Sequence, residues 1–136
     1  MPPLPDEEST ETSAKKPPRP WRHKFGDAFR GLKLGIRGHS SFFVHFFFSV
    51  LVLAAAIMLG CTLEQWGLLV GCIGMVLTAE LFNSALETLV RCLDEQSREH
   101  AKPVLDIAAG AVLLASITAA IIGAAIFATI LFVGKG

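Results

Sequence analysis

The chain has 136 residues, of which 52% are hydrophobic and only 18% are charged, whereas about a quarter of the residues in a typical soluble domain are charged. The 12 basic and 12 acidic residues give a formal net charge of zero, so no overall basic excess points to a nucleic-acid partner. This composition argues against a soluble globule, and the length suits a single domain.

The first segment, 1–19, is rich in proline, serine, threonine and charges of both signs. Such a segment buries too little apolar surface to order itself, so we expect a disordered Pro-rich tail, followed by a membrane domain over 20–136. The first apolar stretch begins near residue 41, too far along the chain for a secretory signal. We therefore expect the apolar segments to remain in the mature protein.

A surface helix is predicted over 21–37. Its apolar side chains recur every three or four residues and share an arc of about 80° at 100° per residue. These residues are Trp21, Phe25, Phe29, Leu32 and Ile36. Cations lie off this stripe, as is typical of a helix in the plane of the lipid headgroups. Three glycines (Gly26, Gly31 and Gly35) weaken it by about 1 kcal/mol each against Ala. An ordinary juxtamembrane anchor without a catalytic part is the equally weighted alternative.

Three stretches lack Asp, Glu, Lys and Arg altogether: 39–63, 65–79 and 107–134. As a helix the last one would span about 40 Å, against about 30 Å for the hydrocarbon core of a bilayer. We therefore predict an all-α integral membrane protein. Its membrane spans are expected at about 41–59, 64–90 and 104–133, and a tight turn makes the first two an antiparallel hairpin.

The basic residues indicate an orientation in the membrane. They cluster before the first span and between the second and third, and the turn between the first two spans has none. The positive-inside rule then places the N-terminus and the second loop of this multi-pass protein in the cytoplasm.

Two further features concern how the helices are held together. Gly67-x-x-x-Gly71 and the Ala/Gly-rich stretch 108–125 supply small residues for close helix contacts, either between copies or within one chain. The three cysteines (Cys61, Cys72 and Cys92) fall at different membrane depths, so no disulfide within the chain is expected.

Polar side chains follow the apolar run of the second span. Glu80 and Glu87 are seven residues apart and share one helix face with Asn83. Ionisable groups inside a membrane are costly and mark functional sites, so we predict a site around these two acids. Asp106, at the start of the third span, has the matching depth.

If the second helix continued into the cytosol, Arg91, Asp94 and Arg98 would join the same face within an arc of about 80°. Such a stripe would bring an anionic, water-soluble substrate against a lipid-soluble one. For Asp94 and Arg98, a solvated helix end is the favoured interpretation.

Carboxylates beside an asparagine suit Mg²⁺, which takes one or two protein carboxylates and completes its shell with phosphate and water. The sequence has no G-x-x-x-x-G-K-[ST] loop, no G-x-G-x-x-G turn and no H-E-x-x-H helix, so a standard soluble nucleotide or zinc site is not expected. His39 and His45 flank the first span without a recognisable metal spacing, and we interpret them as interfacial polar groups.

These residues resemble a known family. The segment 79–87, AELFNSALE, is similar to the E-x-x-N-[ST]-A-[IL]-E signature of the prokaryotic diacylglycerol kinases and undecaprenol kinases. The segment 106–112, DIAAGAV, resembles their second block, K-D-x-[AG]-[AS]-[AG]-A-V, and 29–33, FRGLK, resembles part of their surface helix. The similarity extends from about Trp21 to Phe132.

The resemblance implies a homotrimeric helical bundle in the inner (cytoplasmic) membrane of a bacterial cell, with sites at the cytoplasmic interface. It implies an ATP- and Mg²⁺-dependent lipid kinase that converts diacylglycerol to phosphatidic acid, with undecaprenol as the alternative lipid. By the resemblance Glu80 is the catalytic base and Glu87 the metal-binding acid.

By the same resemblance Asp106 is the acid of the nucleotide site and Asn83 a polar partner, and we assign both to ATP binding. Lys102 is also assigned to ATP binding, as a candidate for a cation that the family pattern has and this chain lacks. Lipid binding is expected at Phe25, Phe29 and Leu32 of the surface helix together with Glu80. In this mechanism Glu80 accepts the proton of the lipid hydroxyl as it attacks the γ-phosphorus, while positioning and electrostatics supply most of the catalysis.

The chain departs from the family pattern at three positions: Leu105 replaces a Lys, His39 a metal-binding Glu and Arg91 an Asp. Lys102 and Arg98 are candidates for the missing cation. Because of these departures, a non-catalytic membrane module of the same fold that binds lipid or a partner remains a second hypothesis. A small channel or transporter is a distant third, since the acids cluster toward one membrane face.

Overall fold

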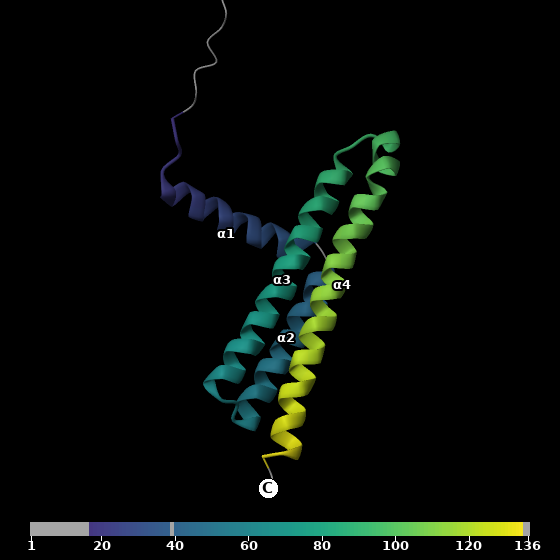
Figure 1. Ribbon diagram of the computed structural model, residues 1–136. Helices are drawn as coiled ribbons and strands as arrows, with labels where there is room; N and C mark the ends of the chain where they lie inside the picture. Colours follow the sequence, from purple (N-terminus) through teal and green to yellow (C-terminus); the bar gives the residue numbers. More distant parts are fainter. Residues whose placement is uncertain (1–16, 39, 135–136) are drawn as a thin grey trace, which may run out of the picture.

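In the computed structural model the described residues, 17–38 and 40–134, form four helices and contain no strand (Figure 1). The helices are α1 (Trp21–Gly38), α2 (Ser40–Leu59), α3 (Leu63–Arg91) and α4 (Glu95–Phe132). α1 and α2 lie within one residue of the helix bounds expected from the sequence. Most of the predicted tail, and His39, lie outside the described residues.

The turn between α2 and α3 is tight for identifiable reasons. Gly60 has a φ of 66°, a left-handed conformation that glycine adopts without steric cost. Thr62 then caps α3: its hydroxyl accepts a hydrogen bond from the Gln65 backbone N–H at 3.3 Å, and the Gln65 side chain accepts one from the Thr62 N–H at 2.9 Å. This reciprocal capping box starts α3 directly after the turn, as the predicted hairpin requires.

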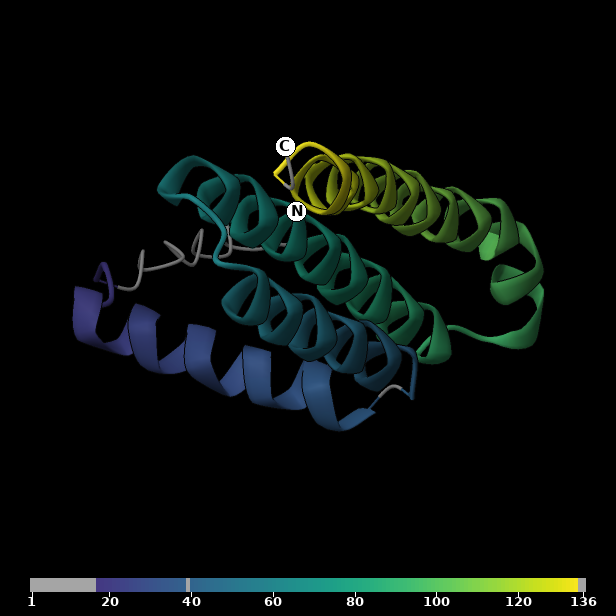
Figure 2. The same cartoon turned by 90° about the horizontal axis from the view of Figure 1, so that it is seen from below.

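α3 is the central helix of the molecule, because it contacts α1, α2 and α4 (Figure 2). Near the α2–α3 turn, Ala56, Leu69 and Ile126 form a small buried core with one residue from each of α2, α3 and α4. α1 extends away from this bundle, on the far side of α3 from most of α4 (Figures 1 and 2).

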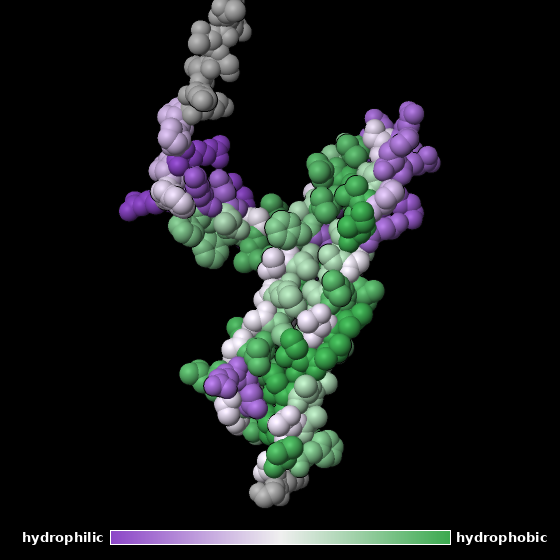
Figure 3. Space-filling model, in the orientation of Figure 1, coloured by the Kyte–Doolittle hydropathy of each residue, from purple (hydrophilic) through white to green (hydrophobic). Residues whose placement is uncertain are grey.

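Three helices, α2, α3 and α4, are long and apolar enough to cross a membrane. Most of their large apolar side chains are exposed in the single chain, which suits a lipid or protein environment. Figure 3 shows hydrophilic residues gathered over α1 and at the α3–α4 turn, with a smaller hydrophilic patch at the α2–α3 turn. Hydrophobic residues cover most of the surface between the two ends of the bundle.

The third membrane span is expected from about 104, and the helix that carries it, α4, begins earlier, at Glu95. Asp94 caps this helix by accepting a hydrogen bond from the Ser97 backbone N–H at 2.8 Å, and Pro103 lies inside it. The stripe from Glu80 to Arg98, which required the second helix to continue into the cytosol, does not form, because α3 ends at Arg91 and Arg98 belongs to α4. A strong cap at Asp94 starts the new helix there.

The glycines differ in what surrounds them. A Cβ on Gly35 would lie 2.6 Å from the Cδ2 methyl of Leu81, so Gly35 lies where α1 crosses α3. Gly67 and Gly71, by contrast, have nothing within 4 Å of where a Cβ would be. The pair therefore does not serve helix packing within the described part of this chain.

The three cysteines (Cys61, Cys72 and Cys92) are free, as the sequence predicted.

Candidate functional site

Glu80 is buried on α3, with its side chain 3% exposed. Its Oε2 lies 3.8 Å from Nε2 of His45, which comes from α2. Its other oxygen, Oε1, is buried and has no hydrogen-bond partner among the described residues. A carboxyl group in this position has one cross-helix neighbour and one oxygen whose hydrogen-bonding capacity is not filled by the described residues.

Asn83 and Glu87 form the next layer of α3 toward the hydrophilic end. Asn83 is 9% exposed and donates a hydrogen bond from Nδ2 to Oε1 of Glu87 at 3.0 Å. Oε2 of Glu87 lies 3.8 Å from the Arg91 guanidinium one turn further along. The structure therefore brings the predicted Asn83 and Glu87 together, and Glu87 lies about 10 Å along the helix axis from Glu80 at about 1.5 Å per residue.

A pocket of about 280 Å³ opens at the end of α3 between Glu87, Arg91, Arg98 and Leu105. Arg98 is engaged by the backbone: its Nε donates to the Leu93 carbonyl at 3.0 Å and its second amino group to the Arg91 carbonyl at 2.7 Å. These bonds satisfy carbonyl groups at the C-terminus of α3. Arg98 therefore has a structural task beside its proposed role as a substitute cation.

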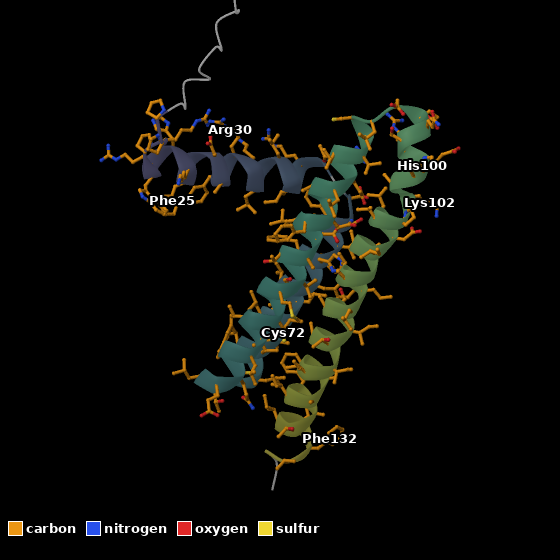
Figure 4. The ribbon with its side chains drawn as sticks, turned by 45° about the horizontal axis from the view of Figure 1, so that its top comes forward. Phe25, Arg30, Cys72, His100, Lys102 and Phe132 are labelled. Carbon is orange, nitrogen blue, oxygen red and sulfur yellow. The ribbon has the colours of Figure 1, made fainter. Side chains whose placement is uncertain are left out.

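Lys102 and Asp106 pair with each other on the outer face of α4, with Lys102 Nζ 3.3 Å from Asp106 Oδ2. Both side chains are exposed, at 75% and 68% respectively. Figure 4 shows Lys102 and His100 on α4 toward the α3–α4 turn. Neither Lys102 nor Asp106 lines the pocket beside Glu87, whereas Leu105 does.

The predicted lipid-binding residues of α1 (Phe25, Phe29 and Leu32) are exposed, whereas Glu80 is buried. Phe25 and Arg30 lie on different sides of α1 in Figure 4. A second, apolar pocket of about 450 Å³ lies between α2, α3 and α4, and its α3 residues lie closer to the α2–α3 turn than Glu80 does. His45 and Ser116 lie in its lining, and Ser116 Oγ is buried without a hydrogen-bond partner in the described part of the chain.

Sequence reasoning missed His45, which it interpreted as an interfacial polar group. A signal was available in the hairpin: His45 precedes Gly60 by 15 residues and Glu80 follows Leu63 by 17, so an antiparallel pair places them at similar depth. Ser84, 2% exposed with an unpartnered Oγ among the described residues, was also missed. Hydropathy gives no such signal for a lone serine.

The described residues contain no group of three or more His, Cys, Asp or Glu side chains arranged to hold a metal ion. Glu87, 34% exposed and held by Asn83, still offers one accessible carboxylate at the boundary between apolar and polar surface. This fits Mg²⁺, because that ion is commonly bound through one or two carboxylates plus substrate phosphates and water. When bound there, Mg²⁺ would neutralise phosphate charge.

Comparison with known proteins gives two matches. Residues 26–127 match the family model for prokaryotic diacylglycerol kinase. The chain is also 38% identical over 100 residues to a diacylglycerol kinase of Synechocystis sp., an overlap that covers 73% of this chain and 57% of that relative. No solved structure matches the chain. Since the family model covers most of the chain, including Glu80, Asn83 and Glu87, the chain belongs to the prokaryotic diacylglycerol kinase family.

Proposed function

We propose that this chain is a lipid kinase that transfers the γ-phosphoryl group of ATP to the hydroxyl group of a membrane lipid, with diacylglycerol as the substrate and phosphatidic acid as the product. The observation that carries the proposal is the buried Glu80 within a membrane-type helix, with Oε1 lacking a partner among the described residues. Family membership supports the reaction class.

In the proposed step the lipid hydroxyl oxygen attacks the γ-phosphorus, and its proton passes to the Glu80 carboxylate. The bond between the γ-phosphorus and its bridging oxygen breaks, and ADP leaves. Glu87, oriented by Asn83, would hold Mg²⁺ on the phosphates, and Asn83, Lys102 and Asp106 are the proposed ATP contacts. Charge stabilisation and positioning account for most of the catalysis in such a reaction.

The lipid is proposed to reach Glu80 laterally from the bilayer, guided by Phe25, Phe29 and Leu32 of α1. Two observations support a surface position for α1: it carries these exposed apolar side chains and a set of cations, and it extends out of the bundle near the hydrophilic end (Figures 1 and 3). We further propose that this end faces the cytoplasm of a bacterial cell and that three copies assemble. Gly67 and Gly71, open in the single chain, support such assembly.

The experiment is phosphoryl transfer from γ-labelled ATP by the purified, reconstituted protein with Mg²⁺, with diacylglycerol and undecaprenol offered in parallel. We expect labelled phosphatidic acid, and a loss of about 10² to 10⁴ in rate for Glu80→Gln, the contribution typical of a general base. Glu64→Gln, the same change at the exposed opposite end of α3, is the matched control.

Preferential labelling of undecaprenol would keep the reaction and change the substrate. No product from either lipid, in a folded protein that also fails to bind Mg-ATP, would favour the non-catalytic lipid- or partner-binding module, for which Leu105 and His39 are the motivation.

A further inference from the structure

We propose that His45 is a positioning residue for Glu80: it holds Oε2 of the carboxylate toward α2 and leaves Oε1 directed at the lipid hydroxyl. This inference rests on the proposed function, in which Glu80 is the base. It adds a residue from α2 to the group of Glu80, Asn83 and Glu87 on α3.

The first argument is the environment of the acid. A carboxylate with a side chain 3% exposed in an apolar helix needs a partner, because its lost hydration is not otherwise replaced. Within the described residues, His45 is the group that lies within ion-pair distance of Glu80. The other carboxylates of described ion pairs (Asp27, Glu87, Glu95 and Asp106) pair with arginine or lysine on more exposed surface.

The second argument is the asymmetry of the two carboxylate oxygens. Oε2 faces Nε2 of His45 at 3.8 Å, a separation that suits an ion pair and is too long for a direct hydrogen bond. Oε1 is buried with no partner in the described part of the molecule. The imidazole lies on the Oε2 side of the carboxyl group and leaves Oε1 as the oxygen that can meet the lipid hydroxyl; positioning of this kind lowers the barrier for an oriented reaction.

The third argument is what surrounds the pair. His45 is partly exposed, at 24%, and lines the apolar pocket of about 450 Å³ between the helices. Arg37 at the end of α1 and Asp106 on α4 are both exposed, and neither is in a described ion pair with Glu80. His45 is thus the described neighbour able to orient Glu80 across helices.

The test compares His45→Gln and His45→Phe in the reconstituted phosphoryl-transfer assay. If His45 positions Glu80, kcat should fall about 10-fold to 100-fold in His45→Phe. This loss is smaller than the loss of about 10² to 10⁴ expected when the base itself is removed. The fall in kcat should be smaller in His45→Gln, because glutamine keeps a polar group. KM values for ATP and lipid should change by less than about twofold, since the contact acts on the reacting step. His100→Gln and His100→Phe, on an exposed histidine, are the matched controls.

If His45 only fills space, His45→Phe should keep more activity than His45→Gln, because phenylalanine fills the space of the imidazole and glutamine does not. The inference would be overturned by a kcat of His45→Phe equal to or higher than that of His45→Gln, or by a kcat that is unchanged in both variants.

A second measurement does not depend on activity. The midpoint of thermal unfolding is compared for wild type, His45→Gln, Glu80→Gln and the double variant. If the pair interacts, the shifts are not additive, as expected for residues in contact. Additive shifts would overturn the inference. Wild-type protein without kinase activity but with non-additive shifts would refute the proposed function and leave the His45–Glu80 interaction standing.

Discussion

A charged side chain inside an apolar helix costs considerable free energy, and Glu80 and Glu87 of α3 lie in different environments. Glu80 is buried beside His45, while Glu87 is partly exposed and is held by the Asn83 amide and the Arg91 guanidinium. The first environment suits a group that exchanges a proton with a lipid hydroxyl. The second suits a carboxylate that faces a cation.

This difference leads to a prediction for Glu87. Glu87→Gln removes the accessible carboxylate, so we expect half-maximal activity to need at least about 10-fold to 100-fold more Mg²⁺, the range found when a residue that only supports a metal ligand is lost. Titration of activity with Mg²⁺ at saturating ATP measures the change. Glu99→Gln, an exposed acid on α4, serves as the control. An unchanged Mg²⁺ requirement in Glu87→Gln would remove Glu87 as the metal-binding acid.

At the scale of the elements, helix ends and crossings determine where the site residues lie. The Thr62 cap starts α3 immediately after the α2–α3 turn, and this sets the register that brings His45 to Glu80. The Asp94 cap begins α4 well before its apolar part and so creates a polar hairpin around Arg91 and Arg98. α1 reaches α3 where Gly35 meets Leu81.

Two glycines of α1 give a matched pair of variants. Gly31 has open space where a Cβ would lie, so Gly31→Ala should stabilise α1 by about 1 kcal/mol through helix propensity. Gly35→Ala should stabilise α1 by less than this, because the new Cβ would lie 2.6 Å from the Leu81 methyl group, which must move. Hydrogen exchange of the α1 amides in bilayers measures both. Equal protection in the two variants would contradict the α1–α3 crossing at Gly35.

The Asp94 cap gives a prediction about pH. Hydrogen bonding from Ser97, with Arg98 nearby, holds the pKa of the Asp94 carboxyl below its ordinary value. The cap therefore stabilises the fold fully above the ordinary pKa of about 3.9, and its contribution is lost as pH falls through the lower folded-state pKa. Asp94→Ala should lower the unfolding midpoint at pH 7, and this deficit should shrink below about pH 4.

Asp94→Asn is the control, because asparagine caps helices as well as aspartate does without titrating. A deficit for Asp94→Ala that stays constant down to about pH 2 would exclude the carboxylate cap as its source.

At the scale of the whole molecule, the chain has a hydrophilic end and an opposite end at the α2–α3 turn (Figure 3). The native cysteines report on both: Cys92 lies exposed after α3, Cys61 lies partly exposed at the α2–α3 turn, and Cys72 is buried between them. Their positions allow a topology test without new residues.

With a membrane-impermeant maleimide, we expect Cys92 to label from the cytoplasmic side, Cys61 from the opposite side and Cys72 from neither. Inside-out and right-side-out vesicles, compared for wild type, Cys61→Ser and Cys92→Ser, assign each label to its residue. Labelling of Cys92 from the outer side only would reverse the proposed orientation, and labelling of both from one side would contradict three membrane spans.

The helical class, the three membrane-type helices and the family could all be predicted from the sequence, because charge-free runs and a spaced E-x-x-N-x-x-x-E pattern are local properties of the chain. The sequence also pointed to Glu80, Asn83 and Glu87, since helix periodicity places them on one face. Three other matters became visible only in the folded chain: α4 begins at a cap that hydropathy does not register, Asp106 pairs with Lys102 on the outside, and His45 faces Glu80. The last of these depends on the register between two helices, which is fixed by the turn and by packing and is not encoded in either helix alone.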